Sequence, residues 1–353
     1  MLGSPGDIVI AVMGVTGAGK TTFVNYLADQ ELQIGHGLEP CTQDVHVVPC
    51  TLPDGKRIYL VDTPGFDDTY RSDTEILREV ANWLNTAYKM EIKLTGIIYL
   101  HRILDVRVGG AGVKNLKMFK KLCGDDGLAS VVFATTMWSF IPDEETGKRR
   151  EDQLKSGAIF WKHMIQQGSE VFRQDKGRAS AQEIVNYLIE KRRPVTLDIQ
   201  REMVDQNMQL NETGAGAEIV SAVDQAKRYY EQKLEETRVK LEAAIARKDD
   251  DQKEELEEYK KEMERKMAKD QEDIRRLQAN SEQLHEETMR KHKEEMLQLT
   301  QIIQEKDKQL QEYQHQTDQL KIQSEHELEM EKIRAQMKLK ELRYKTATQC
   351  NVM

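Results

Sequence analysis

The chain has 353 residues, and its 61 Asp and Glu against 52 Lys and Arg give a formal net charge of -9. This acidic balance argues against a nucleic-acid partner held by bulk electrostatics, and every apolar run is far shorter than the ~20 residues that a membrane-spanning helix needs. All 21 Gly and all 7 Pro lie at or before Gly216, whereas residues 218–353 hold 27 Lys and Arg and 32 Asp and Glu. The composition therefore predicts one globular domain followed by one long, highly charged helix.

The N-terminal segment and the cysteines bear on the cellular compartment. Residues 1–7 lack a basic start and a cleavable apolar core, which predicts that no secretory signal is present. The cysteines have no paired spacing and so predict neither a disulfide framework nor a zinc site. They are Cys41, Cys50, Cys123 and Cys350. Together these features favour a reducing, cytoplasmic compartment.

Residues 1–193 alternate between strand and helix patterns. The predicted strands are 7–13, 45–52, 56–61, 95–100, 130–135 and 170–173. The predicted helices are 21–30, 74–88, 113–122, 152–167 and 181–191. The second and third strands flank Pro53-Asp54-Gly55, which is typical of a hairpin turn. Repeated strand–helix units with one hairpin predict a three-layer α/β fold with a mostly parallel sheet.

The rest of the chain is predicted to be helical. Residues 194–217 form a linker, a helix of about eighteen residues that ends at a glycine hinge, Thr213-Gly214-Ala215-Gly216. Residues 218–345 follow without a helix breaker and carry apolar residues at coiled-coil spacing, in a frame that shifts along the helix. Such a polar helix needs a partner helix, which predicts a homo-oligomer; a solvated single helix is the alternative.

A phosphate-binding motif follows the first strand. Residues 14–21 match G-x-x-x-x-G-K-[ST] between a buried strand and a helix, so that backbone N–H groups can face phosphates. Lys20 is expected to reach the β- and γ-phosphates and the Thr21 hydroxyl to bind Mg²⁺. The predicted nucleotide-binding residues of this loop are Gly14, Thr16, Gly17, Ala18, Gly19, Lys20, Thr21 and Thr22.

Two further segments complete the predicted phosphate and metal site. Asp62 ends the third strand, where an acid holds Mg²⁺ through water, and Gly65 can offer its backbone N–H to a γ-phosphate. Thr42 precedes the second strand and is the candidate to close on Mg²⁺ when a triphosphate is bound; a plain strand-entry role is the alternative. The predicted metal ligands are thus Thr21, Thr42 and Asp62.

These motifs resemble the first three G-box motifs of the translation-factor-related class of P-loop GTPases. Residues 14–22 and 62–68 are similar to septins and to the immunity-associated GTPases. Residues 36–42, 98–102 and 134–138 are similar to fungal "G domain-containing" proteins that carry a charged helical tail. The resemblance covers about residues 7–216 and implies a G domain that uses GTP, GDP and Mg²⁺.

The base-recognition motif departs from that pattern. GTPases of this kind carry Asn-Lys-x-Asp after the fifth strand, and its Asp pairs with guanine N1 and N2 hydrogens. Here the segment reads Thr135-Thr136-Met137-Trp138, with no acid before Asp143. Preference for guanine therefore rests on the resemblance, and an ATPase is an alternative. Trp138 is a candidate to stack on the base, with packing against the protein as the favoured alternative.

The catalytic residues are less evident. Phe66 follows Gly65, where Ras-type enzymes place a water-orienting Gln, so that hydrolysis is expected to be slow. The resemblance implies that a dimer of G domains completes such a site. Arg102, Arg107 and Arg71 are the candidate cations, each with a solvated surface role as the alternative. The predicted catalytic residues are Lys20, Thr42, Gly65 and Arg102, whereas His101 is expected to be a packed histidine.

The last residues, 346–353, end in Cys350-Asn351-Val352-Met353, which matches a prenylation motif. Residues 331–345 just before them carry six Lys and Arg against two Glu, the second signal that one lipid needs for stable anchoring. The sequence thus predicts a guanine-nucleotide switch or scaffold with slow Mg²⁺-dependent hydrolysis and a peripheral membrane tether. The rival interpretation is a non-hydrolysing coiled-coil structural protein with a nucleotide-stabilised head.

Overall fold

The computed structural model describes residues 7–30, 44–105, 109–191, 193–247 and 250–294, with single helical positions from there to Lys338. The chain divides into two units, Met1–Glu286 and Glu287–Met353. Thr42, Arg107 and Cys350 lie outside the described residues. Within the described part, no helix combines the length and the apolar character needed to cross a membrane.

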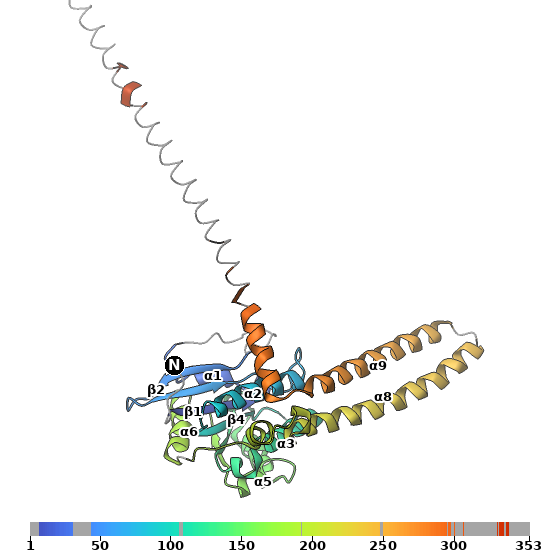
Figure 1. The fold of residues 1–353 in the computed structure, drawn as a ribbon, viewed down its shortest axis with the longest axis horizontal. Helices are drawn as coiled ribbons and strands as arrows, with labels where there is room; N and C mark the ends of the chain where they lie inside the picture. The colour runs from blue at the N-terminus through green and yellow to red at the C-terminus, as the bar shows by residue number, and fades with distance from the viewer. Residues whose placement is uncertain are drawn as a thin grey trace, which may run out of the picture. The chain divides into compact units, whose positions relative to one another are not determined.

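A six-stranded sheet forms the centre of the first unit (Figure 1). Its strands are β1 (Ile8–Gly14), β2 (His46–Thr51), β3 (Arg57–Asp62), β4 (Gly96–Arg102), β5 (Val131–Thr136) and β6 (Glu170–Arg173). The strand order is β2-β3-β1-β4-β5-β6, with β2 and β3 antiparallel and the other pairs parallel. The predicted α/β fold with a mostly parallel sheet and one hairpin is confirmed.

Alternate side chains of the strands enter two separate cores. The helices of this unit are α1 (Lys20–Asn25), α2 (Asp73–Lys89), α3 (Gly110–Leu128), α4 (Glu144–Ser156), α5 (Lys162–Gln166), α6 (Arg178–Lys191), α7 (Asp198–Gln200), α8 (Gly214–Arg247) and α9 (Asp250–Leu277). On β1, Val9, Ala11 and Met13 face α2, α3 and α8, whereas Ile10 and Val12 face α1 and α6. This burial on both faces explains the continuous apolar run of β1.

Several predicted helix bounds are wrong for local reasons. The predicted helix 21–30 ends at Asn25, because the chain must turn to reach the β2 edge. The predicted helix 152–167 is two helices, and α4 begins earlier because the Asp143 side chain accepts from the Thr146 backbone N–H. The stretch 194–213, predicted to be one helix, contains only α7, a π-type turn and a 3₁₀ turn.

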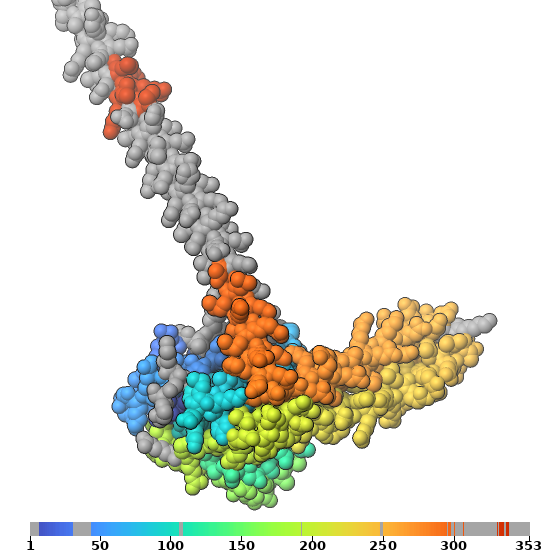
Figure 2. Space-filling model, viewed as in Figure 1, coloured from blue at the N-terminus to red at the C-terminus, as the bar shows by residue number. Residues whose placement is uncertain are grey.

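The predicted uninterrupted helix from 218 to 345 is also wrong. α8 ends at Arg247 and α9 begins at Asp250, and the two helices pack against each other as an antiparallel hairpin (Figures 1 and 2). Residues 278–280 are not helical, and a new helix starts at 281. A reciprocal cap marks this start, since Asn280 Oδ1 accepts from Gln283 N and Gln283 Oε1 accepts from Asn280 N. α8 thus finds a partner helix within its own chain.

The base of the hairpin is attached to the larger of the two cores. Ile219 of α8 and Leu277 of α9 are buried in the larger core. Leu210 donates its backbone N–H to the Ala279 carbonyl at 2.9 Å, which joins the start of the hairpin to its end. The predicted glycine hinge is instead a tight contact, because a Cβ on Gly216 would lie 1.8 Å from the Leu210 carbonyl oxygen. The hairpin therefore leaves the domain from a rigid base.

We predict that Gly216→Ala destabilises the protein by about 1–3 kcal/mol, since the added methyl group meets a backbone carbonyl that cannot rotate away. Gly214→Ala is the matched control, because its Cβ would make only ordinary contact with Lys121 at 3.4 Å. Chemical denaturation followed by circular dichroism measures both free energies of unfolding. Equal stability of the two variants would contradict this packing.

Candidate nucleotide-binding site

Polar residues gather where the parallel strands end. Gly14 ends β1, Asp62 ends β3, Arg102 ends β4, Thr136 ends β5 and Arg173 ends β6. Carboxyl ends of parallel strands share one edge of a sheet, which is where open α/β folds bind ligands. The fold thus brings together residues that are up to 159 positions apart in the sequence.

The loop between β1 and α1 has the backbone that a phosphate cradle requires. Gly17 and Gly19 have φ values of 76° and 89°, in the left-handed region that favours glycine. Gly14 packs so closely on β4 that a Cβ there would lie 2.4 Å from the Leu100 carbonyl oxygen. Successive N–H groups of such a loop, together with a helix N-terminus, form an anion-binding concavity. This geometry fits the predicted role of residues 14–22.

Lys20 is buried beneath this loop. Its Nζ donates to the carbonyl oxygens of Gly14 at 3.3 Å and Val15 at 3.0 Å, and the residue is only 6% exposed. Burial lowers the pKa of Lys20 to about 8, an effect that the carboxylates of Asp62 and Asp68 oppose. An ammonium held here without its water shell is strongly attracted to a polyphosphate.

Thr21 and Asp62 lie side by side, as a magnesium site requires. The Thr21 hydroxyl donates to Asp62 Oδ2 at 2.8 Å, and Asp62 is fully buried. A hydroxyl and a carboxylate are the hard oxygen donors that suit Mg²⁺, which would keep several of its waters here. The residues present therefore fit this ion, with Thr21 as the ligand and Asp62 behind it.

Gly65 packs against the phosphate loop so closely that there is no room for a side chain. A Cβ on Gly65 would be 2.6 Å from Lys20 Nζ and from the Thr16 backbone. The Thr16 hydroxyl donates to the Gly65 carbonyl at 3.0 Å and to Asp68 Oδ2 at 3.1 Å. The Phe66 side chain is only 1% exposed and belongs to the core, so it cannot reach a water at the phosphates.

Of the two candidate cations among the described residues, Arg102 lies against the phosphate loop. Its Nη1 would be 3.1 Å from a Cβ on Gly17, and its Nε pairs with Asp105 at 3.2 Å. By contrast, Arg71 is held by Glu79 at 2.7 Å. Both Arg102 and His101 line a pocket of about 170 Å³. His101 packs edge-on against Trp161, and burial lowers the pKa of this histidine to about 4.

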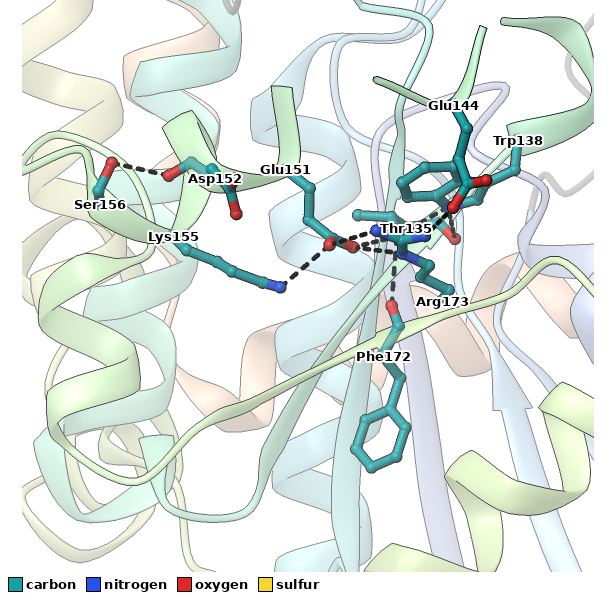
Figure 3. A network of polar contacts seen from close by, with 9 residues as sticks. All are labelled: Thr135, Trp138, Glu144, Glu151, Asp152, Lys155, Ser156, Phe172 and Arg173. Atoms are coloured by element: carbon teal, nitrogen blue, oxygen red, sulfur yellow. Dashed lines mark hydrogen bonds and ion pairs between the residues drawn. The ribbon is translucent and has the colours of Figure 1, made fainter. Parts of the chain in front are cut away.

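Trp138 does not offer an open face for stacking. The Arg173 guanidinium carbon lies 3.9 Å above the centre of its ring, and the indole Nε1 donates to Thr135 Oγ1 at 3.0 Å (Figure 3). A Cβ on Gly147 would lie 2.5 Å from the ring edge. The packing alternative for Trp138 is therefore the one that the structure favours, because the guanidinium already occupies the ring face that the side chain presents.

The sequence did not single out the partners of Trp138. Glu151 is only 4% exposed and accepts from Arg173 Nη2 at 3.1 Å, Lys155 Nζ at 3.0 Å and Thr135 Oγ1 at 3.2 Å. These residues come from three separate elements, so no local motif joins them. The only available signal was the helix start at Asp143-x-x-Thr146, which places α4 beside the end of β5.

We predict that Lys20→Met stabilises the nucleotide-free protein at pH 7 and abolishes nucleotide binding. With its pKa lowered, Lys20 binds fewer protons in the folded than in the unfolded chain between about pH 8 and 10.5, so the contribution of Lys20 to stability becomes less unfavourable as the pH rises across that window. The full effect is about 3 kcal/mol at most, at ~1.4 kcal/mol per pKa unit for this shift from 10.5 to about 8.

Denaturation curves between pH 7 and 10.5 measure this effect. Buried Cys50 and Cys123, whose pKa values are raised by burial, lower the stability of every variant alike above about pH 9, so the variants are compared with one another. The wild type and Lys56→Met, whose side chain is exposed beside Asp54, are expected to gain stability relative to Lys20→Met as the pH rises through this window. An unchanged pH profile in Lys20→Met would show that Lys20 is not the buried cation.

Comparison with known proteins agrees with this geometry. Residues 9–120 match the family model described as "50S ribosome-binding GTPase". No curated protein sequence matches the chain. The match spans the phosphate loop, Asp62 and Gly65, which are the residues described above.

Three solved structures illustrate the similarity of fold. Toc33 from Arabidopsis thaliana, solved with GDP and Mg²⁺, is 17% identical with a TM-score of 0.44, over 55% of this chain and 89% of its own. A variant of Era from Aquifex aeolicus, bound to GDP·AlF4⁻, is 17% identical with a TM-score of 0.39, over 53% and 57%. A bacterial selenocysteine-specific elongation factor is 16% identical with a TM-score of 0.37, over 53% and 28%. Likeness at this level does not carry function across.

The family match and the local geometry nevertheless agree on the N-terminal part of the chain. A mostly parallel sheet carries a glycine-rich phosphate loop with a buried lysine, a Thr–Asp pair suited to Mg²⁺ and a closely packed Gly65. The chain therefore contains a P-loop GTPase domain with the G-domain fold, followed by a region of long helices.

Proposed function

We propose that this protein is a guanine-nucleotide switch with slow, Mg²⁺-dependent GTP hydrolysis, whose nucleotide state acts on the helical hairpin α8–α9. The observation that carries the proposal is a contact between the end of α9 and the first turn of α2, next to the residues around Gly65. We call it the α2–α9 contact and define it by Ser72 and Glu75 of α2 and Asp273 and Arg276 of α9.

The α2–α9 contact consists of two polar pairs. Ser72, the N-cap of α2, donates its hydroxyl to Asp273 Oδ1 at 3.1 Å. Arg276 donates to Glu75, and this pair together with Arg71 lowers the pKa of Glu75, against the effect of burial. In Figure 2 the end of α9 (orange) lies next to α2 (cyan). The end of α9 is thus bonded to the first turn of α2.

The same first turn is linked to the phosphate loop. Asp67 donates its backbone N–H to Asp73 Oδ1 at 3.0 Å, and its neighbour Asp68 accepts from Thr16 at 3.1 Å. A γ-phosphate that draws the Gly65 N–H toward it must move this segment relative to Thr16. Because Gly65 has no clearance, such a movement displaces Asp67 and, through Asp73, the start of α2. Ordering of this kind of segment by a γ-phosphate is a general device of GTPases.

Hydrolysis depends on a cation and on the position of a water. We propose that Arg102 supplies the cation within its own domain, because it already lies at Gly17. Phe66 cannot orient a water, so that G-domain pairing between two copies is proposed to complete the site. The rival proposal, a non-hydrolysing structural protein, is favoured if turnover stays at the level of a protein-free blank over all protein concentrations.

We predict that Arg102→Ala lowers GTP turnover roughly 100-fold while nucleotide affinity changes only a few-fold, since the cation acts on charge that develops in the transition state. Phosphate release is measured over a range of protein concentrations, and specific activity is expected to rise with concentration. Arg71→Ala is the control, because Glu79 already binds that guanidinium. Equal losses in the two variants would remove Arg102 from the proposed chemistry.

We predict that Arg276→Ala loosens the end of α9, because it removes the ion pair with Glu75. Amide hydrogen exchange over residues 270–277 should become faster, and a non-hydrolysable GTP analogue should produce the same change in the wild type. Arg275→Ala is the matched control, since Arg275 pairs with Glu272 on the exposed face of α9. If the analogue leaves exchange in α9 unchanged, the hairpin is not the output of the switch.

A further inference from the structure

The polar network beyond the ends of β5 and β6 is built around one rigid arginine (Figure 3). Arg173 donates to both carboxylate oxygens of Glu151, from Nε at 3.3 Å and from Nη2 at 3.1 Å. The central carbon of its guanidinium also lies over the Trp138 ring, 3.9 Å from the ring centre. The Nε and Nη2 donors and one face of the Arg173 guanidinium are thus fixed by partners. Its Nη1 lies 3.7 Å from the Glu144 carboxylate.

This network is attached to the phosphate loop. The Thr136 hydroxyl donates to the Ala18 carbonyl at 3.0 Å, so the end of β5 touches the loop directly. Gln174, the residue after β6, donates its backbone N–H to the Thr135 carbonyl at 2.8 Å. A nucleotide whose phosphates lie on the loop extends its base along this edge of the sheet, toward the segments that follow β5 and β6.

Guanine and adenine require different hydrogen-bonding partners from the protein at this position. Guanine presents N1–H and N2–H₂ donors side by side, for which a carboxylate is the natural acceptor, whereas adenine has an acceptor at N1. The segment that replaces Asn-Lys-x-Asp holds no acid, so the acceptor must come from another position. In the described part of the chain, Asp143 precedes α4, Glu144, Glu145 and Glu151 lie on it, and Asp175 follows β6. The charges of Glu144, Glu151 and Asp175 act on Arg173.

Two of these carboxylates already have partners within the protein. Asp143 accepts from the backbone N–H and the hydroxyl of Thr146 as the cap of α4. Glu151 is buried and accepts from three side chains. Glu144 is different, because its side chain is 68% exposed and lies between Lys148 at 3.0 Å and Arg173 at 3.7 Å. A hydrogen bond from Lys148 and the charges of Lys148 and Arg173 hold the pKa of Glu144 below its usual value.

We propose that Glu144, aligned by the fixed guanidinium of Arg173, is the residue that recognises the guanine base and replaces the missing aspartate. This inference rests on the proposed function, because it assumes that a nucleotide occupies the phosphate loop. The Glu144 carboxylate accepts from guanine N1–H and N2–H₂. Arg173 is a positioning residue, held in turn by Glu151 and Trp138.

The test is a change of base preference, measured as equilibrium binding of GTP, xanthosine triphosphate and ATP with Mg²⁺. In Glu144→Gln the amide still accepts from N1–H but now donates, which suits the C2 carbonyl of xanthine and repels the guanine amino group. GTP affinity should fall by about 10- to 100-fold and xanthosine triphosphate should become the preferred nucleotide, as the loss of a charged hydrogen bond implies. Arg173→Lys should weaken the wild-type preference without reversing it.

Matched variants separate this outcome from others. Glu145→Gln changes the adjacent exposed carboxylate and should keep the wild-type preference for GTP. The inference is overturned if Glu144→Gln keeps that preference, or if Asp175→Asn, and not Glu144→Gln, reverses it. Glu144 is exposed, so the variant is expected to fold, and thermal denaturation checks this. A wild type that binds none of the three nucleotides would overturn the proposed function as well.

Discussion

The burial of one ammonium group is the constraint on which the site depends. The Lys20 ammonium exchanges its water shell for the carbonyl oxygens of Gly14 and Val15. The lowered pKa indicates that these two acceptors replace only part of the lost hydration. A polyphosphate supplies the missing negative charge. The left-handed glycines give the loop backbone its curve, and the absent side chain at Gly65 lets that segment approach Lys20 and Thr16.

The sequence predicted those parts of the molecule whose signals are local. The strand before Gly14, the phosphate loop and the acid at Asp62 each lie in one short segment with its own pattern, and the structure places them together. The turn at Pro53-Asp54-Gly55 likewise joins the only antiparallel pair of the described sheet. Such segments can be predicted because their geometry follows from the residues themselves.

The helical region shows why other parts could not be predicted. A polar helix with weak apolar spacing favours a partner but does not say whether that partner is another chain or the next segment of the same one. The break at 278–280 contains neither Gly nor Pro, and only the pair Asn280 and Gln283 marks the new helix start. The Glu151–Arg173–Trp138 contacts were missed for a related reason, since three separate elements contribute one residue each.

The antiparallel hairpin has a mechanical consequence. Lys233 lies near Tyr259 and Tyr230 near Lys266, so the two helices pair around a midpoint close to residue 248, along a seam whose buried members include the small Thr237 and Ala244. These small side chains let the two helices approach each other closely. A shift of α9 by one turn, about 5.4 Å, would carry Arg276 past Glu75. Such a shift would break the pair with Glu75 and so reach the first turn of α2, whose Asp73 accepts the Asp67 backbone N–H beside the phosphate loop.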